Sequence, residues 1–230
     1  MRLDRFIESK LAVSAQSVRE LFLQRQVLLN GIAVSEGRGR ISEFCRVEVA
    51  GRILQSREAV YIMLHKPQGC VSATKDAKNK TVIDLLDFPQ KENLHLAGRL
   101  DFNTTGLLLL TNDGKWSRKI TQPTHKIPKT YLVQTKEVIT EDYVRVFAEG
   151  IYFGFEDLTT LPAELTILSP YSARLTIYEG RYHQVKRMFG FFNNEVVGLH
   201  RLSMGKIILD TNLAAGEYRL LTAEEIDSIK

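Results

Sequence analysis

Hydrophobic residues recur at helical spacing over the first 23 residues, in two groups separated around Ser14. This spacing predicts two short helices. Two apolar runs then flank Asn30-Gly31, a dipeptide that favours a two-residue hairpin turn. We therefore expect two helices followed by a small twisted sheet that is complete by about residue 57. The apolar positions of the two helices are Leu3, Phe6, Ile7, Leu11, Val18, Leu21, Phe22 and Leu23.

Beyond residue 57, short apolar runs alternate with a few amphipathic segments, and no fixed-period repeat is present. The segment 106–111 contains four consecutive leucines and predicts a buried strand, which Asn112-Asp113-Gly114 ends in a turn. The chain is therefore expected to be α+β, with a mixed sheet flanked by helices. Further strands are predicted within AVYIMLHKPQGCVSA and over 130–134, 164–168, 173–178 and 206–209, and helices over 82–86, 141–150 and 181–192.

The composition is that of an ordinary globular protein, with 44% hydrophobic and 25% charged residues. No βαβ periodicity or glycine-rich phosphate loop is present, which argues against a nucleotide cofactor. The apolar runs are too short to cross a bilayer, and the N-terminus has no signal-peptide core. Cys45 and Cys70 lack metal-ligand or disulfide-framework spacing. We expect a cytoplasmic protein without a metal and without a membrane partner.

Positive charge is concentrated in the N-terminal quarter of the chain. Residues 1–57 contain ten Lys and Arg against six Asp and Glu, whereas residues 58–230 contain 21 of each kind. The whole net charge of +4 therefore belongs to the first segment. This distribution favours an anionic partner for that segment.

A second basic region, residues 114–136, contains no acidic residue at all. Trp116 and Tyr131 alternate with its cations, so the segment offers both phosphate contacts and aromatic faces for exposed bases. The alternative is a merely solvated charged face. The basic residues are Lys115, Arg118, Lys119, Lys126, Lys129 and Lys136, together with His125.

A third group of cations lies in YEGRYHQVKRMFGF, residues 178–191, at the start of a predicted helix. Cations at a helix N-terminus oppose the helix dipole, so we expect an anion opposite them, either a ligand or the carboxylate of Asp101. The alternative is a set of solvated cations framing a core helix. The group comprises Arg181, His183, Lys186 and Arg187.

Asp101 directly precedes the leucine-rich strand, where an unpaired carboxylate would be costly. It therefore either caps a turn or performs chemistry. No histidine, cysteine or carboxylate lies at metal-ligand spacing from His183, no serine occupies a nucleophile elbow, and Asp101 has no acidic companion of the kind a glycosidase needs. One aspartate, one tyrosine and a set of cations remain as the candidate chemistry.

The stretch GRLDFNTTGLLLLTNDG, with HKPQG before it and KTYLV and GRYHQVKRM after it, resembles the RsuA family of pseudouridine synthases. MRLDRFI, the helix at 18–23 and VLLNGIAV resemble the αL RNA-binding domain of a small-subunit ribosomal protein. The resemblance implies an αL domain over 1–57 and a catalytic domain over 58–230. The catalytic domain is expected to have a mixed, largely antiparallel sheet.

The resemblance further implies that the protein isomerises a specific uridine of 16S ribosomal RNA to pseudouridine, as a monomer and within a small-subunit assembly intermediate. No cofactor is implied. Two alternatives stay open, namely the same chemistry on 23S ribosomal RNA and a non-catalytic RNA-binding or assembly protein in which Asp101 caps a turn.

The family resemblance also implies roles for particular residues. Asp101 matches the catalytic aspartate, Tyr131 the tyrosine that stacks on the target base and takes part in proton transfer, and Lys186 the cation that pairs with the aspartate. A lysine at position 186, where distant relatives have arginine, implies a single-point ion pair. Arg99 matches the basic residue near the flipped nucleotide. The remaining RNA-binding candidates are Arg181, His183, Arg187, Lys115, Arg118, Lys119 and Lys129.

Overall fold

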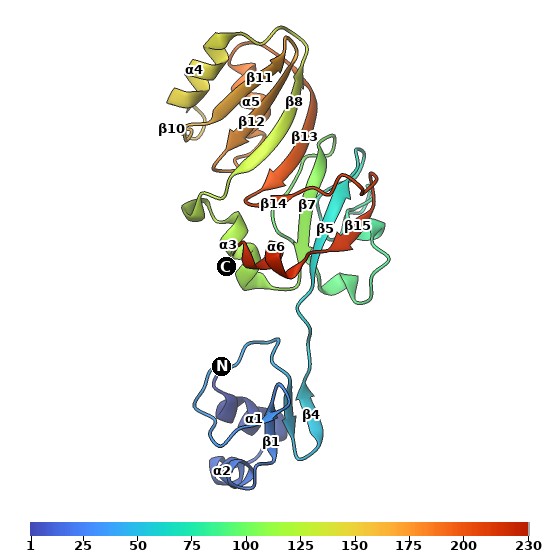
Figure 1. Cartoon of the computed structure of the whole chain (residues 1–230), viewed down its shortest axis with the longest axis vertical. Helices are drawn as coiled ribbons and strands as arrows, with labels where there is room; N and C mark the ends of the chain where they lie inside the picture. The colour runs from blue at the N-terminus through green and yellow to red at the C-terminus, as the bar shows by residue number, and fades with distance from the viewer. Residues whose placement is uncertain (230) are drawn as a thin grey trace. The chain divides into compact units, whose positions relative to one another are not determined.

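The computed structural model describes residues 1–229 and divides into two compact units, Met1–Ala59 and a second unit that begins at Val60. Both units combine helices with a sheet (Figure 1). The first unit contains one hydrophobic cluster, and the second contains two. The chain therefore buries its apolar side chains separately in each unit.

The first unit begins with two helices, α1 (Leu3–Leu11) and α2 (Ala15–Leu23), which confirms the pair predicted from the apolar spacing. Ser14 separates them, because its hydroxyl accepts a hydrogen bond from the backbone N–H of Ser17 and so caps α2. Both helices pack their apolar faces into one core. Its buried members are Leu3, Phe6, Ile7, Val18, Phe22, Val27, Val47 and Val49.

The predicted hairpin is confirmed between β1 (Val27–Leu29) and β2 (Ile32–Ala33). Asn30 and Gly31 both have a positive φ, 51° and 82°, as a two-residue turn of this kind requires. The sheet of this unit has four strands in the order β2-β1-β3-β4. Its remaining strands are β3 (Val47–Val49) and β4 (Arg52–Gln55).

The second unit is built on a nine-stranded sheet whose main path runs β11-β12-β8-β13-β7-β5-β15. β13 and β7 run parallel and the other neighbours on this path are antiparallel, which confirms a mixed, largely antiparallel sheet. The strands are β5 (Tyr61–Lys66), β6 (His95–Leu96), β7 (Thr105–Thr111), β8 (Lys129–Thr135), β11 (Glu164–Ser169), β12 (Ser172–Ile177), β13 (Val196–Met204), β14 (Ile207–Ile208) and β15 (Tyr218–Leu220). A separate hairpin consists of β9 (Tyr152–Phe153) and β10 (Leu158–Thr159).

β7 lies inside this sheet and is buried on both of its faces. Leu108 and Leu110 belong to one hydrophobic cluster, whereas Leu107 and Leu109 belong to the other, because successive side chains of a strand point to opposite faces. The run of four leucines is therefore the buried strand that was predicted. Core packing on both faces holds the strand, and with it the loop that precedes Thr105.

Helices and 3-10 turns connect the strands of the second unit, and two predicted helices differ from those observed. The segment 82–86 contains only a 3-10 turn, and 181–192 contains a helix that begins three residues later than expected, because His183 has a left-handed φ of 48°. The helix at 141–150 is confirmed. The elements are α3 (Gly114–Thr121), α4 (Glu141–Glu149), α5 (Gln184–Gly190), α6 (Ala223–Asp227), η1 (Ile83–Leu85), η2 (Lys91–Asn93) and η3 (Pro123–His125). Within residues 1–229, no helix has both the length and the hydrophobicity needed to cross a bilayer.

The first part of the basic region after β7, Gly114–Thr121, folds into α3, a helix that the sequence analysis did not predict. The Asp113 carboxylate accepts hydrogen bonds from the backbone N–H groups of Lys115 and Trp116 and so caps the helix. The expectation that Trp116 offers an aromatic face to RNA is wrong. Its ring is 4% exposed, contacts Tyr61, and donates its indole N–H to the carbonyl of Ile226.

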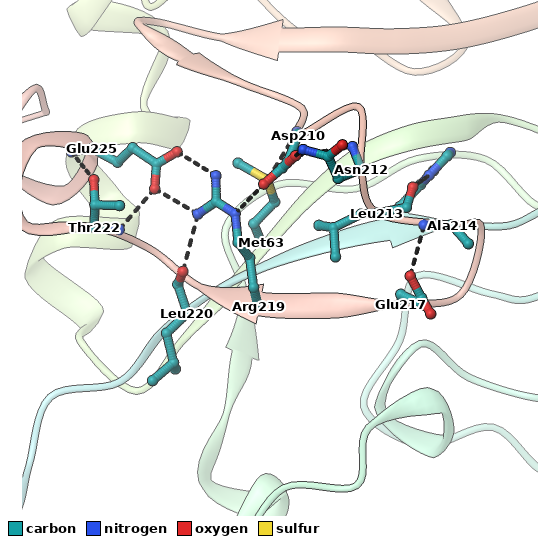
Figure 2. A network of polar contacts seen from close by, with 11 residues as sticks. Met63, Asp210, Asn212, Leu213, Ala214, Glu217, Arg219, Leu220, Thr222 and Glu225 are labelled. Carbon is teal, nitrogen blue, oxygen red and sulfur yellow. Dashed lines mark hydrogen bonds and ion pairs between the residues drawn. The ribbon is translucent and has the colours of Figure 1, made fainter.

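Arg219 on β15 joins the C-terminal segments of the second unit (Figure 2). Its guanidinium donates to one oxygen of Asp210 and to both carboxylate oxygens of Glu225, all at 2.8 Å, and to the Leu220 carbonyl at 3.0 Å. All three guanidinium nitrogens therefore have partners. The bond from Arg219 lowers the pKa of Glu225, which also completes a capping box with Thr222 at the start of α6.

Candidate active site

Asp101 lies in the loop that leads into β7. The turn in this loop is closed by the backbone carbonyl of Asp101, which accepts a hydrogen bond from the N–H of Thr104 at 3.0 Å. The Asp101 carboxylate itself faces two basic side chains of the segment before and within α5. His183 Nε2 lies 3.5 Å from Asp101 Oδ1, and Lys186 Nζ lies 3.9 Å from Oδ2. The cationic segment therefore lies opposite Asp101, although its first two basic residues precede the helix.

Lys66, at the end of β5, holds the loop from inside. Its Nζ atom donates to the carbonyl oxygens of Asp101, Phe102 and Thr104 at 3.1, 3.2 and 2.9 Å, and to that of Pro67 at 3.1 Å. The residue is 0% exposed, and burial lowers the pKa of its ammonium. Carbonyl dipoles thus replace water around this charge and hold the Asp101 backbone in place.

A cleft of about 640 Å³ opens beside Asp101. It is lined by the Asp101 loop, by residues of β8, β12 and β13, and by the segment from Gly180 to Lys186. Among the described residues that line the cleft, Asp101 is the only carboxylate. The predicted site residues that line it are Arg99, Asp101, Lys129, Tyr131, Arg181, His183 and Lys186.

Tyr131 reaches the cleft from β8, in the middle of the sheet. It is paired in register with Leu175 of β12 and with Arg201 of β13, and it is 7% exposed. A strand held on both sides leaves the tyrosine ring little freedom. Its ring is therefore a rigid aromatic wall in the same cleft as the Asp101 carboxylate.

Four predicted RNA-binding residues do not line the cleft. Arg187 forms a bidentate ion pair with Glu156 at 2.5 and 2.6 Å, and its guanidinium lies 3.7 Å from the centre of the Phe153 ring. The other three, Lys115, Arg118 and Lys119, share an exposed face of α3 because they are spaced by three and four residues. Thr121 at the end of α3 and Pro123 just after the helix do line the cleft.

Sequence reasoning did not identify Lys66, Thr104 or Arg201 as members of the site. Arg201 is 2% exposed, and its Nε and Nη1 atoms donate to the carbonyls of Leu107 and Arg99 at 2.8 and 3.4 Å. Lys66 stands in HKPQG, a stretch that carried the family resemblance. Arg201 lies in LHRLSMG, where a lone basic residue in an apolar run was a usable signal.

The site thus combines one carboxylate, one buried tyrosine and several cations. Such a set can support nucleophilic or general-base chemistry by the carboxylate on a substrate that carries negative charge. Within residues 1–229, no cluster of three or more His, Cys, Asp or Glu side chains is arranged to hold a metal ion.

Known proteins resemble this chain over its full length. Residues 60–190 match the family described as RNA pseudouridylate synthase. The chain is 50% identical to the ribosomal small subunit pseudouridine synthase A of Pseudomonas aeruginosa, with 100% of both chains covered. Identity to the protein of the same name from Haemophilus influenzae is 45%, over 100% of this chain and 99% of the relative. A solved structure described as a crystal structure of pseudouridylate synthase matches with 44% identity and a TM-score of 0.73, over 100% of both chains.

Proposed function

The chain belongs to the RNA pseudouridylate synthase family, and from this premise we propose that it isomerises one uridine of 16S ribosomal RNA, with Asp101 as the catalytic residue. Family membership makes the protein an RNA pseudouridine synthase. The choice of small-subunit RNA is supported by the full-length identity of 50% to a ribosomal small subunit pseudouridine synthase.

The position of Asp101 as the only carboxylate among the described cleft-lining residues supports its catalytic role most directly. The reaction breaks the N1–C1′ bond of uridine, turns the uracil and rejoins it through C5. A carboxylate serves this reaction either as a nucleophile towards the sugar or the base, or as a base that removes a sugar proton. In each case the carboxylate of Asp101 is the reacting group, and His183 Nε2 and Lys186 Nζ lie beside it at 3.5 and 3.9 Å.

Two other cleft residues take defined roles in this proposal. Tyr131 offers its ring to the flipped uracil and its hydroxyl to the proton that leaves C5. Arg99 is exposed at the cleft and is two residues from Asp101, so it fills the space that the flipped nucleotide leaves in the RNA. Lys129 and Arg181 provide further positive charge in the cleft, and His183 offers its imidazole to the RNA.

RNA outside the cleft is bound by basic surfaces on both units. On the second unit, the exposed face of α3 with Lys115, Arg118 and Lys119 contacts phosphates. Residues 1–57 form the αL RNA-binding domain, since they contain the whole net charge of +4 and fold as two helices and a small sheet. The protein acts in the cytoplasm as a monomer on a small-subunit assembly intermediate.

Pseudouridine mapping in both ribosomal RNAs tests the substrate. A strain that lacks the gene should lose pseudouridine at one position of 16S RNA, and the wild-type gene should restore it. The purified protein should modify partly assembled small subunits faster than naked 16S RNA. Loss of a pseudouridine from 23S RNA alone would contradict the proposed substrate, and equal rates on both forms of 16S RNA would contradict the assembly intermediate.

Deletion of residues 1–57 tests the αL domain. The shortened protein should bind RNA more weakly and with a shallower salt dependence, by roughly one unit of log–log slope for each phosphate that it no longer binds. Fluorescence anisotropy over a range of salt concentrations measures this. A variant with Lys115, Arg118 and Lys119 changed to glutamine is the matched control for α3. An unchanged slope after the deletion would assign the phosphate contacts to α3 instead.

A further inference from the structure

Two buried side-chain polar atoms of the described residues have no hydrogen-bond partner within that part of the chain, and both belong to residues that line the cleft beside Asp101. They are the hydroxyl oxygen of Thr104 and the Nη2 atom of Arg201. Thr104 is 1% exposed and Arg201 is 2% exposed. A buried donor without an acceptor destabilises the fold, so two such groups in one cleft require a reason.

Arg201 is held close to the Asp101 loop by the packing of β13 against β7. A Cβ atom on Gly106 would lie 2.3 Å from the carbonyl oxygen of Arg201, so only glycine permits the two strands to approach this closely. The Arg201 guanidinium then donates to the carbonyls of Leu107 and Arg99, on either side of the loop. Its third nitrogen stays unpartnered within the described residues.

Lys129 adds a second buried cation to the same cleft. It is 8% exposed, and its Nζ atom donates to the carbonyl of Ile127 at 2.9 Å. Burial, followed by the nearby charge of Arg201, lowers the pKa of Lys129 to about 8. Neither Lys129 nor Arg201 forms an ion pair with a carboxylate of the described residues. Glu179 acts on Lys129 only through its charge, and the Asp101 carboxylate lies beside Lys186 instead. Within the described residues, these two cations and the Thr104 hydroxyl therefore line the cleft without a carboxylate bonded to them.

The burial of these groups indicates which part of an RNA provides the anion. Phosphates stay on the solvated backbone, where an exposed cation such as Lys115 of α3 meets them. Side chains that are more than nine-tenths buried fit a planar base that has left its stack and entered the cleft. The acceptor for these donors is therefore the base and its carbonyl oxygens.

We infer that Thr104, Lys129 and Arg201 form a site that stabilises the negative charge on the uracil ring while it is detached from the ribose. The inference rests on the proposed function. When the N1–C1′ bond breaks, its electron pair stays on the uracil and spreads over N1, C5 and both carbonyl oxygens, while the sugar either bonds to Asp101 or gives a proton to it. The C5–C1′ bond then uses an electron pair of the ring, the C5 proton leaves, and N1 gains a proton, so atoms and electrons balance. Donors placed where this charge develops lower the barrier.

Thr104→Val tests the hydroxyl with little change in shape. In the full-length protein we expect the single-turnover rate at saturating RNA to fall about tenfold to a hundredfold, with unchanged RNA affinity and an unchanged or higher Tm. Thr135→Val is the matched control, because the buried Thr135 hydroxyl donates to the Glu137 carbonyl outside the cleft. That variant should have a lower Tm and a wild-type rate. A wild-type rate in Thr104→Val, or a loss confined to RNA affinity, would overturn the inference.

Lys129→Met separates charge stabilisation from a structural role. Fluorine at C5 withdraws electrons and stabilises the uracil anion, so an RNA with 5-fluorouridine at the target position depends less on the protein's donors. The variant should lose a larger factor in the rate of N1–C1′ cleavage with uridine than with 5-fluorouridine, measured as loss of the original nucleoside from digested RNA. Equal factors for the two RNAs would overturn the inference. Wild-type protein inactive on small-subunit RNA would instead contradict the proposed function.

Discussion

Two arginines of the same sheet, Arg219 and Arg201, have opposite surroundings. Arg219 on β15 is bonded through all three guanidinium nitrogens, to two carboxylates and one carbonyl (Figure 2). Arg201 on β13 is more deeply buried, contacts only carbonyls, and leaves one nitrogen without a partner in the described chain. A cation that stabilises the fold is neutralised by the protein, whereas a cation that serves a ligand is left for that ligand to neutralise.

The same difference separates two sites of the second unit, one around Arg219 and one around Asp101. Around Arg219 each charge has a protein partner, and hydrogen bonding to Arg219 lowers the pKa of Glu225. Around Asp101 one carboxylate faces several cations, so the described lining of the cleft has a surplus of positive charge. Such a surplus costs folding free energy when the cleft is empty and becomes useful when RNA enters it. Substitutions around Asp101 should therefore change turnover, whereas substitutions around Arg219 should change the free energy of unfolding.

The largest effect on turnover is expected at Asp101. Asp101→Asn removes the carboxylate with almost no change in shape, so we expect a loss of turnover of roughly a thousandfold or more, with RNA affinity and Tm retained. Single-turnover pseudouridine formation and thermal unfolding measure the two effects. A folded variant that still forms pseudouridine at a substantial rate would show that Asp101 is not the catalyst.

Tyr131→Phe should cause the next largest loss. The phenyl ring retains the stacking face but lacks the hydroxyl, so we expect nearly normal RNA binding and roughly a hundredfold slower turnover, since a positioned proton-transfer group contributes about this much. Tyr131→Ala is the companion variant and should reduce both RNA binding and turnover. Wild-type turnover in Tyr131→Phe would remove the hydroxyl from the mechanism.

A smaller effect is expected in the pH dependence of turnover. The pKa of Lys129 is lowered to about 8, while Arg201 and Glu179 act on it in opposite directions. Its positive charge is therefore present below pH 8 and is lost as the pH rises, so turnover should fall by up to tenfold for each unit above 8. Lys129→Arg retains its charge at high pH and should move this decline upwards. A decline at the same pH in both proteins would assign it to another group.

The folded-state pKa of Lys129 lies below the ordinary value of 10.5, so the free energy of unfolding should also depend on pH through this group. The unfolded chain binds the proton more tightly, so between pH 8 and 10.5 the contribution of Lys129 to the free energy of unfolding rises with pH. The free energy of unfolding of the wild type minus that of Lys129→Met, measured by chemical denaturation, should therefore increase over this range. Activity and stability thus change in opposite directions as the pH rises.

The smallest effect on activity is expected at Arg219. Arg219→Leu leaves Asp210 and Glu225 without their shared cation, so the free energy of unfolding should fall by about 1–3 kcal/mol while turnover of the folded protein is unchanged. Because the pKa of Glu225 is lowered in the folded state, this loss should shrink as the pH falls below its ordinary value of 4.5. Arg174→Leu, at an exposed position of β12, is the control and should change stability by less than about 0.5 kcal/mol. A large loss of turnover in Arg219→Leu would contradict the conclusion that Arg219 stabilises the fold and takes no part in catalysis.

Local patterns predicted the elements in which neighbouring residues decide the conformation. Asn30-Gly31 predicted a hairpin because these two residues tolerate a positive φ, and four leucines at 107–110 predicted a buried strand. The helix over 181–192 was predicted too long, since its periodicity does not show that His183 adopts a left-handed conformation. Trp116 was misassigned because an aromatic residue among cations has the same sequence pattern whether it faces RNA or the core.

The sequence by itself determined the family, the place of Asp101 before a buried strand, and the kinds of side chain around it, because these depend on residue order and local spacing. Only the tertiary structure decided that His183 lies beside Asp101 together with Lys186, and which charged groups have partners. Lys66 on β5 holds the Asp101 loop, whereas Thr104, Lys129 and Arg201 line the cleft from the loop before β7, from β8 and from β13. Only the pairing of these strands brings the four residues together. The absence of a partner is a property of three-dimensional surroundings, and no arrangement of neighbours along the chain encodes it.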